Sequence, residues 1–252
     1  MKIQYCSDLH LEFRENKNFL REHPIEPTGE LLLLAGDVVP FALMEKHNDF
    51  FDFISDHFQT TYWLPGNHEY YHYDISKRSG TLNEDIRTNV HLVNNVTIEK
   101  DTLRLIFSTL WSEINPDNHL SIEKDLSDFH LIQYKGYRYS VDRYNELHKE
   151  CLRFIKSELQ HSVNGKTIVV THHVPTLLNY PEQYKGSSLN EAFAVELSGL
   201  IKATSPDYWI YGHHHNNTSD FKISKTQMLT NQLGYVKYGE QNGFRTDAII
   251  EI

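Results

Sequence analysis

Six short apolar runs, each followed directly by polar residues, limit what this 252-residue chain can fold into. They lie at residues 3–6, 31–35, 62–64, 103–107, 167–170 and 208–211. Near-continuous hydrophobicity over so few residues is typical of central β-strands that are covered on both faces. Helical periodicity occurs between some of these runs, so strands and helices alternate along the chain. This alternation predicts a layered α/β fold.

Three segments carry the helical pattern. Residues 141–160 place Val141, Leu147 and Ile155 on one apolar stripe, and Ser140 is the expected N-cap. Residues 190–203 show a similar pattern, and residues 41–58 show it less regularly. The part after residue 220 is richer in strand and turn signals. We expect one domain over residues 1–252, because this length can bury a sizeable core and no linker or repeat divides it.

Residues 112–140 fit neither pattern. The segment is polar, rich in aromatic residues and contains the stretches NPDN and YKGYRY. Long irregular segments of this kind often carry specificity, so we expect a surface insertion near the polar strand ends. Two interpretations stay open. The segment forms a wall of the substrate pocket, with His130 and Tyr134 as its polar groups, or it packs over hydrophobic surface and never meets the substrate.

The formal net charge of −10 argues against a protein that binds nucleic acid or an anionic membrane, because both partners require basic surfaces. A metal-lined pocket for an anion remains compatible with this charge. Cys6 and Cys151 give no disulfide framework and are expected in the core. We find no signal peptide and no apolar segment long enough to span a bilayer, so we expect a cytoplasmic protein.

The polar residues after the apolar runs are of a restricted kind. SDLH follows the first run, AGD the second and PGNHE the third, while THH and GHHH follow the runs at 167–170 and 208–211. Each residue alone is explained as a helix cap or a turn residue. Together they bring Asp, His and Asn to the carboxyl ends of five strands, where α/β sheets bind ligands. This donor set, without a thiolate, suits hard-to-borderline divalent metals.

The three consecutive histidines of GHHH cannot all face the same point. Neighbouring side chains of an extended segment point to opposite sides. His213 and His215 can therefore face one site together, and His214 is expected to face away.

The ordered series D-x-H, G-D, G-N-H-E, H and G-H-x-H resembles the calcineurin-like metallophosphoesterase superfamily, from Lys2 to about His215. The stretches GNHEYY, TLW and NQLGY resemble a bacterial branch of that superfamily, whose substrates are largely unassigned. The resemblance implies a four-layer α/β/β/α sandwich with a dimetal site at the C-terminal ends of the strands.

The resemblance also implies a role for each matching residue. The first metal would be held by Asp8, His10 and His215, and the second by Asn67, His172 and His213, with Asp37 bridging both. The choice of His172 over His173 follows from the family pattern. His68 would protonate the leaving oxygen or bind the phosphoryl group. Glu69, where most relatives have aspartate, would orient His68 through its other ring nitrogen.

The implied activity is hydrolysis of a phosphoester, with a phosphodiester preferred, by a hydroxide shared between the two metals. Mn²⁺ is the expected metal, and Fe, Zn²⁺ or Ni²⁺ suit the same donors. The expected partner is a small phosphoester substrate; nucleic acid is disfavoured, no membrane is expected, and the oligomeric state stays open.

Two other functions remain as alternatives. One is a pyrophosphohydrolase acting on a nucleotide or a similar compound, although related lipid-precursor pyrophosphatases usually carry arginine at the position of His68. The other is a non-catalytic scaffold on the same fold, against which the intact His68 and the complete ligand set argue.

Overall fold

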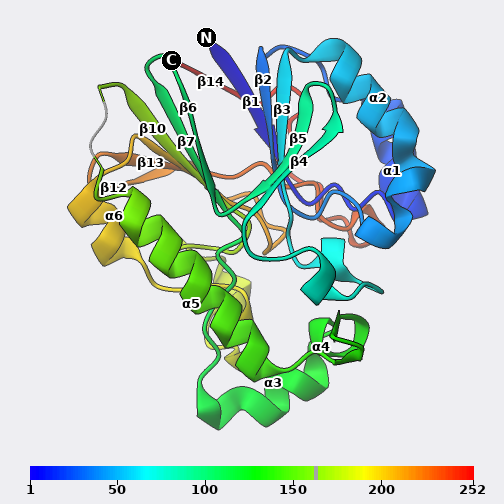
Figure 1. Ribbon diagram of the computed structural model, residues 1–252, viewed down its shortest axis with the longest axis vertical. Coiled ribbons are helices and arrows are strands. Elements are labelled where there is room, and N and C mark those ends of the chain that lie inside the picture. Colours follow the sequence, from blue (N-terminus) through cyan, green and yellow to red (C-terminus); the bar gives the residue numbers. More distant parts are fainter. Residues whose placement is uncertain (162–163) are drawn as a thin grey trace.

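The apolar runs form strands of two six-stranded sheets in the computed structural model, which describes residues 1–161 and 164–252 (Figure 1). The first sheet has the order β14-β1-β2-β3-β5-β4. Its strands are β1 (Lys2–Cys6), β2 (Leu31–Ala35), β3 (Thr60–Leu64), β4 (Leu82–Arg87), β5 (Val90–Asn94) and β14 (Ile249–Glu251). The inner strands β1, β2, β3 and β5 are parallel, while β14 and β4 run antiparallel at the two edges. The carboxyl ends of the inner strands therefore lie at the same edge.

The second sheet repeats this arrangement with the order β12-β13-β11-β10-β7-β6. Its strands are β6 (Val96–Lys100), β7 (Leu103–Ser108), β10 (Lys166–Thr171), β11 (Tyr208–Ile210), β12 (Phe221–Ile223) and β13 (Thr226–Leu229). Again the inner strands are parallel and the two edge strands antiparallel.

Helices cover the outer faces of both sheets, so that the layers follow in the order α/β/β/α (Figure 1). The first sheet is covered by α1 (Arg14–Glu22) and α2 (Asn48–His57), and the second by α5 (Val141–Glu158) and α6 (Ser198–Thr204). Short 3-10 helices lie in the connections: η1 (Phe41–His47), η2 (His68–Tyr70), η3 (Ile75–Lys77), η4 (Pro116–Asn118), η5 (Glu182–Tyr184), η6 (Ser188–Ala192) and η7 (Val236–Tyr238). This is the sandwich that the resemblance implied.

The continuous hydrophobicity of the strands is explained by burial on both faces. In β2, the side chains of Leu31 and Leu33 belong to the core between the two sheets. Leu32 and Leu34 alternate with them and belong to the core under α1 and α2. A strand in this position has no face in water, so the period-2 alternation of polar residues is lost.

The predicted strands and the first predicted helix are confirmed with small shifts at their ends. The helix expected at 141–160 is α5, and the hydroxyl of Ser140 accepts a hydrogen bond from the backbone N–H of Arg143, as an N-cap does. The candidate at 41–58 is divided into η1 and α2. The expected strand-rich part after residue 220 contains β12, β13 and β14.

The helix predicted at 190–203 is wrong in its first half. Helical structure occurs as η6 and α6, and the residues between them pair through their backbone with Val174 and Pro175. There the N–H of Val195 donates to the carbonyl of Val174, and that of Leu197 donates to the carbonyl of Pro175. Pairing with a distant segment has therefore overridden the local helical pattern.

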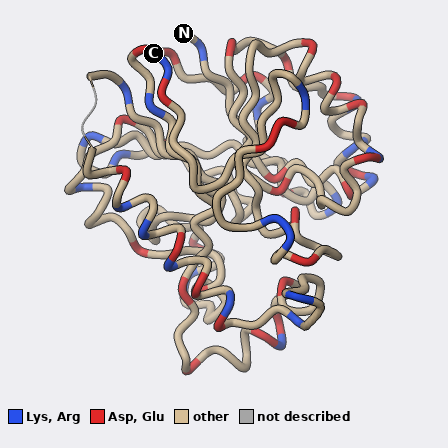
Figure 2. Tube along the Cα trace, in the orientation of Figure 1, with Lys and Arg blue, Asp and Glu red and all other residues tan. Residues whose placement is uncertain are grey.

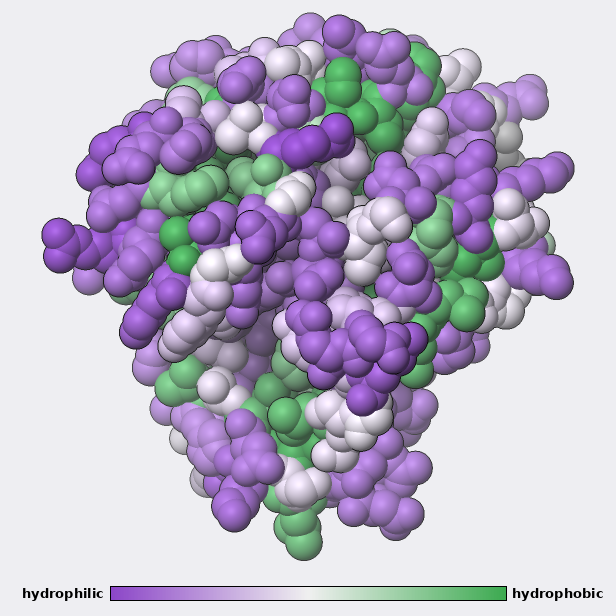
Figure 3. Space-filling model, turned by 180° about the vertical axis from the view of Figure 1, so that it is seen from behind, coloured by the Kyte–Doolittle hydropathy of each residue, from purple (hydrophilic) through white to green (hydrophobic). Residues whose placement is uncertain are grey.

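Residues 112–140 are less exposed than the sequence suggested. They form α3 (His119–Asp125), α4 (Asp128–Leu131) and a small hairpin of β8 (Gln133–Tyr134) and β9 (Tyr137–Arg138). Ile122, Phe129 and Tyr139 are buried in the same core as α1 and α2. α3 and α4 lie at the end of the molecule away from the termini, and the face seen from behind carries hydrophobic residues toward that end (Figures 1 and 3). The segment expected as a surface insertion therefore also contributes side chains to the core, as one of the two interpretations allowed.

Within the described part of the chain, no helix combines the length and the apolar character that crossing a membrane would require.

Candidate metal centre

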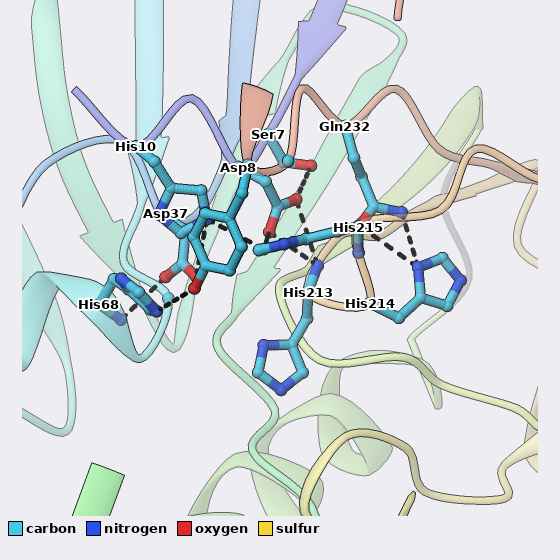
Figure 4. Close-up of polar contacts among 12 residues, drawn as sticks. Ser7, Asp8, His10, Asp37, His68, His213, His214, His215 and Gln232 are labelled. Carbon is cyan, nitrogen blue, oxygen red and sulfur yellow. Dashed lines mark hydrogen bonds and ion pairs between the residues drawn. The ribbon is translucent and has the colours of Figure 1, made fainter. Parts of the chain in front are cut away.

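The carboxyl ends of five strands from both sheets bring a group of polar side chains together (Figure 4). The chain leaves β1 at Asp8 and His10, β2 at Asp37, β3 at Asn67 and His68, β10 at His172, and β11 at His213 and His215. Of these eight residues, only His215 is half-buried, and the others are at most 6% exposed. All the predicted ligand residues therefore lie in one buried place.

One group consists of Asp8, His10, Asp37 and His215, whose donor atoms lie within 4.8 Å of one another. The Nε2 atoms of His10 and His215 are 2.9 Å apart. The Nε2 atom of His215 is 3.4 Å from a carboxylate oxygen of Asp8, and that of His10 is 3.8 Å from Asp37. Nitrogen and oxygen donors thus converge from four side chains.

The second group shares Asp37 with the first and adds His172 and His213. The Nε2 atom of His172 is 3.1 Å from Nδ1 of His213 and 3.4 Å from Oδ2 of Asp37. It is also 3.1 Å from the amide oxygen of Asn67. The two groups overlap at Asp37, and together with Asn67 they contain the residues for which the resemblance implied metal binding.

The four histidine rings have the hydrogen-bonding pattern of metal ligands. In each ring, the nitrogen that faces away from the group contacts an acceptor. The acceptors are Glu12 for His10, the carbonyl of Ala35 for His172, the carbonyl of Ala192 for His213, and Glu240 for His215. Such an acceptor fixes the tautomer and leaves the lone pair of the other nitrogen directed inward. The donor set therefore fits divalent cations.

Five of the seven predicted ligand residues have left-handed backbone conformations. The φ angles are 56° at Asp8, 47° at His10, 53° at Asp37, 78° at His213 and 49° at His215. Residues other than glycine adopt this region at a cost on the order of 1–2 kcal/mol each, and such strain clusters at functional sites. We attribute this strain to the turns that the chain makes directly after the strands, because these turns bring the side chains to a common point.

Two glycines of the motifs leave the space that the group needs. A Cβ atom at Gly36 would collide with the ring of His172, and one at Gly66 would collide with Asp37 and His172. The glycines in AGD and PGN are thus explained by close approach of side chains to the backbone.

Buried carboxylates make this centre electronegative. Burial alone would lower the pKa of His215, but hydrogen bonds to Asp8 and Glu240 outweigh burial and raise it to about 10. Burial also opposes the charged form of His172, yet the charge and hydrogen bond of Asp37 raise its pKa to about 9. The same field that attracts these protons would attract a metal cation in their place.

His68 lies beside the two groups without belonging to the predicted ligands. Its Nδ1 atom is 3.0 Å from Glu12, and its Nε2 atom is 3.0 Å from the hydroxyl of Tyr235. The ring of Tyr71 stacks on it, with the centroids 4.0 Å apart. Burial would lower the pKa of His68, but the charges of Asp37 and Glu12 outweigh burial and raise it. The position suits a proton donor.

The expectation that Glu69 orients the ring of His68 is wrong. One oxygen of Glu69 accepts hydrogen bonds from the N–H of Val38 and the indole of Trp63, and the other accepts from the N–H groups of Asp37 and Gly66. All four donors belong to the segments that carry Asp37 and Asn67. Glu69 therefore holds two motif loops together, and Glu12 is the carboxylate that contacts the His68 ring.

His214 faces away from the group, as the alternation of side chains predicted (Figure 4). Its Nδ1 atom is 2.9 Å from the amide nitrogen of Gln232, and the ring packs near Tyr180 and Tyr211. His173 is also directed elsewhere, with Nδ1 3.3 Å from the carbonyl of Thr109. Neither residue belongs to the two donor groups.

Four further residues at the site had not been identified from the sequence. Glu12 contacts His10 and His68, Tyr235 contacts His68, Glu240 contacts His215, and Asp128 contacts Asn67. Glu12 extends the first motif to D-x-H-x-E, and Tyr235 ends the stretch NQLGY, so both had a local signal. Asp128 and Glu240 had none, because only the folded chain brings them to the site.

Within residues 112–140, the structure brings Asp128 rather than His130 or Tyr134 to the site. The ring of His130 contacts the carbonyl of Lys124 and lies at the exposed surface. The guanidinium of Arg143 lies over the ring of Tyr134, with its central carbon 4.9 Å from the ring centroid. By contrast, Asp128 is only 1% exposed and accepts hydrogen bonds of 2.8 Å from the Asn67 amide and the Tyr71 hydroxyl.

Comparisons with known proteins agree with this geometry. A family model described as calcineurin-like phosphoesterase matches residues 1–217. An uncharacterised protein of Acanthamoeba polyphaga mimivirus is 34% identical over 276 residues, covering 99% of this chain and 96% of the viral protein. The crystal structure of the phosphopantetheinyl hydrolase of Mycobacterium tuberculosis has a similar fold, with a TM-score of 0.70 and 14% identity over 99% of this chain and 95% of that one.

Proposed function

The chain belongs to the calcineurin-like phosphoesterase family and is a metal-dependent phosphoesterase, and on this premise we propose that its substrate is a phosphodiester. Members of the family typically bind two divalent metals. We propose that Asp8, His10 and His215 hold one ion, that Asn67, His172 and His213 hold the other, and that Asp37 contacts both. The observation that carries this assignment is the pair of overlapping donor groups that share Asp37.

Metal ions bound there would stabilise charge on the phosphoryl oxygens and lower the pKa of a water molecule that attacks phosphorus. The protein itself supplies the proton for the leaving oxygen. His68 is suited to this task because Glu12 accepts a hydrogen bond from its Nδ1 atom. Its other ring nitrogen, Nε2, lies 3.0 Å from the hydroxyl of Tyr235. Against the effect of burial, the charges of Asp37 and Glu12 raise the pKa of His68, which is the direction that a general acid requires.

Preference for a diester over a monoester follows from charge. A monoester brings close to two negative charges to the site, and a diester brings one. A cavity beside the donor groups is lined by Asp125, Asp128 and Glu240, and none of its described lining residues is lysine or arginine. A less negative substrate with a second organic group is therefore favoured.

The alternatives are disfavoured on the same grounds. A pyrophosphohydrolase substrate carries further negative charge, which this cavity does not neutralise. A non-catalytic scaffold would have no need of His68 with its carboxylate partner. The described lysines and arginines are scattered along the trace among carboxylates and form no continuous basic band in Figure 2, which supports a small substrate over nucleic acid.

Further features of the proposal rest on the sequence alone. Mn²⁺ is proposed as the metal because it suits a set of imidazole, carboxylate and amide donors, as do Fe, Zn²⁺ and Ni²⁺. A cytoplasmic location and a place in a bacterial branch remain proposals, the latter based only on the stretches GNHEYY, TLW and NQLGY.

The test compares bis(p-nitrophenyl) phosphate with p-nitrophenyl phosphate, using protein stripped with a chelator and reloaded with Mn²⁺. We expect metal-dependent turnover with a higher kcat/KM for the diester. A higher value for the monoester would contradict the diester preference. Absence of metal-dependent turnover with both compounds would contradict the proposed hydrolysis itself.

A further inference from the structure

A cavity of about 350 Å³ continues from the metal centre toward residues 112–140. Asp37, Asn67 and His68 form the end of the cavity at the metal centre. Its other walls come mainly from residues 125–128 and the segment 180–193, together with Tyr71, Tyr235 and Glu240. A phosphate placed at the metal centre would therefore have its organic group inside this cavity.

Aromatic rings form much of the wall and begin directly at the metal centre. Tyr71 stacks on His68, and Phe193 stacks on His213 with the centroids 4.6 Å apart. Tyr180 and Tyr184 line the cavity farther along, with their ring centroids 6.3 Å apart. Rings of this kind bind apolar groups and also attract cations through their faces.

Apart from the histidines of the metal centre, the charged side chains of the wall are carboxylates among the lining residues that the structure describes. Asp125 and Asp128 come from residues 112–140, and Glu240 comes from the C-terminal part. Asp128 is buried, and its Oδ2 atom has no hydrogen-bond partner within the described chain. A negative group in this cavity would meet carboxylates and no lysine or arginine.

We propose that this cavity selects the organic part of the substrate by charge, accepting an uncharged or cationic group and rejecting a second phosphate. This inference rests on the proposed hydrolysis of a phosphoester and specifies its substrate class. A cationic group is attracted by the ring faces and the carboxylates, while an anionic group is repelled by the same carboxylates. The substrate then carries a single phosphate, held at the metal centre.

Three p-nitrophenyl diesters test the inference, because they share the leaving group and differ only in the second substituent. That substituent is choline, ethyl or 2-phosphoethyl, which is cationic, neutral or anionic. We expect kcat/KM for the choline diester to equal or exceed that for the ethyl diester. The kcat/KM for the phosphoethyl diester should be about tenfold lower than that for the ethyl diester, because one screened repulsion of about 1.4 kcal/mol corresponds to this factor.

A charge reversal in the cavity tests whether the preference among the three diesters arises there. Asp125→Lys should raise the ratio of phosphoethyl to choline hydrolysis on the order of fivefold or more. Asp117→Lys is the matched control, because Asp117 is exposed on the same segment and does not line the cavity. The control should leave that ratio unchanged. Equal changes in both variants would assign the effect to the general charge of the protein and overturn the inference.

Binding gives a readout that does not depend on turnover. Isothermal titration of Mn²⁺-loaded His68→Ala protein should show tighter binding of the choline diester than of the phosphoethyl diester. Hydrolysis of all three diesters with equal efficiency, or a preference for the anionic one, would overturn the inference while leaving the phosphoesterase function intact. No metal-dependent hydrolysis of any diester would overturn both.

Discussion

The role proposed for His68 is proton transfer, whereas the seven predicted ligand residues are proposed to bind metal. His68 lies against Asp37 and contacts Glu12 and Tyr235 through its two ring nitrogens. We expect His68→Ala to retain its metals and to lose about 10²–10⁴-fold in kcat, the usual contribution of general acid–base catalysis. The loss should be smaller for p-nitrophenyl diesters than for alkyl diesters, because a good leaving group needs little protonation.

Metal content by elemental analysis, measured on the same preparation as kcat, checks this expectation. His57→Ala is the control, because His57 is an exposed histidine at the end of α2. Loss of metal from His68→Ala in proportion to the loss of activity would contradict the assigned role.

Asp128 determines which atom of the Asn67 amide faces the metal centre. Its carboxylate accepts a hydrogen bond from the amide nitrogen of Asn67, so the amide oxygen is turned toward His172. Without that acceptor, the amide can rotate and present N–H groups, which do not bind metal.

We expect Asp128→Ala to weaken the second metal site about 10–100-fold while the first site keeps its affinity, the usual effect of removing such a partner. Mn²⁺ titration followed by electron paramagnetic resonance distinguishes a spin-coupled pair from a single ion. Tyr71→Phe serves as the control, because it removes the other hydrogen bond to the same carboxylate oxygen and leaves Asn67 in place. Equal weakening of both sites would show a general loss of structure instead.

Among the elements, α5 shows how far local sequence determines structure. Its N-terminus is set by Ser140, whose hydroxyl accepts from the N–H of Arg143 at 3.3 Å. We expect Ser140→Ala to lower the free energy of unfolding by about 1 kcal/mol through loss of this cap. Urea denaturation measures the change. Ser157→Ala is the matched control at an exposed position of the same helix and should change stability by no more than about 0.5 kcal/mol. Equal losses in both variants would contradict a capping role.

Elements with a strong local signal could be predicted from the sequence, and so could the residues at their ends. The strand Leu31–Ala35 has the predicted bounds because its five apolar residues are all buried. Asp37 follows this strand, and the order of the motifs along the chain predicted which other motif residues lie near it in the fold. The assignment of Glu69 failed for a different reason. Sequence adjacency to His68 suggested a contact, whereas the side chain points to the backbone of Asp37 and Val38.

Long-range pairing explains the other departures. The segment between η6 and α6 leaves the helical pattern and forms backbone hydrogen bonds from Val195 and Leu197 to residues 174 and 175. Likewise, Asp128 reaches Asn67 across 61 positions of sequence. Periodicity and spacing within a short window contain no information about either contact, so neither could be predicted from one sequence.

At the scale of the whole molecule, the metal centre joins the two sheets. Asp8, His10, Asp37 and Asn67 follow strands of the first sheet, and His172, His213 and His215 follow strands of the second. Ions bound by both sets would connect the halves of the sandwich. Because the unfolded chain has no such arrangement, metal binding should stabilise the folded protein by about 2.7 kcal/mol at a free metal concentration of one hundred times Kd.

This stabilisation should depend on pH with a definite sign. The pKa values of His172 and His215 are raised to about 9 and 10 in the metal-free fold. Their protons stabilise that fold fully below the unfolded pKa of about 6.5, and this contribution is lost as pH rises through 9 and 10. Metal must displace the same protons, so its apparent affinity rises with pH as long as the pH lies below these two pKa values. We therefore expect the Tm difference between Mn²⁺-loaded and chelator-treated protein to widen from pH 6 to pH 8 in scanning calorimetry. A difference that stays constant or narrows would contradict competition between metal and protons at these two histidines.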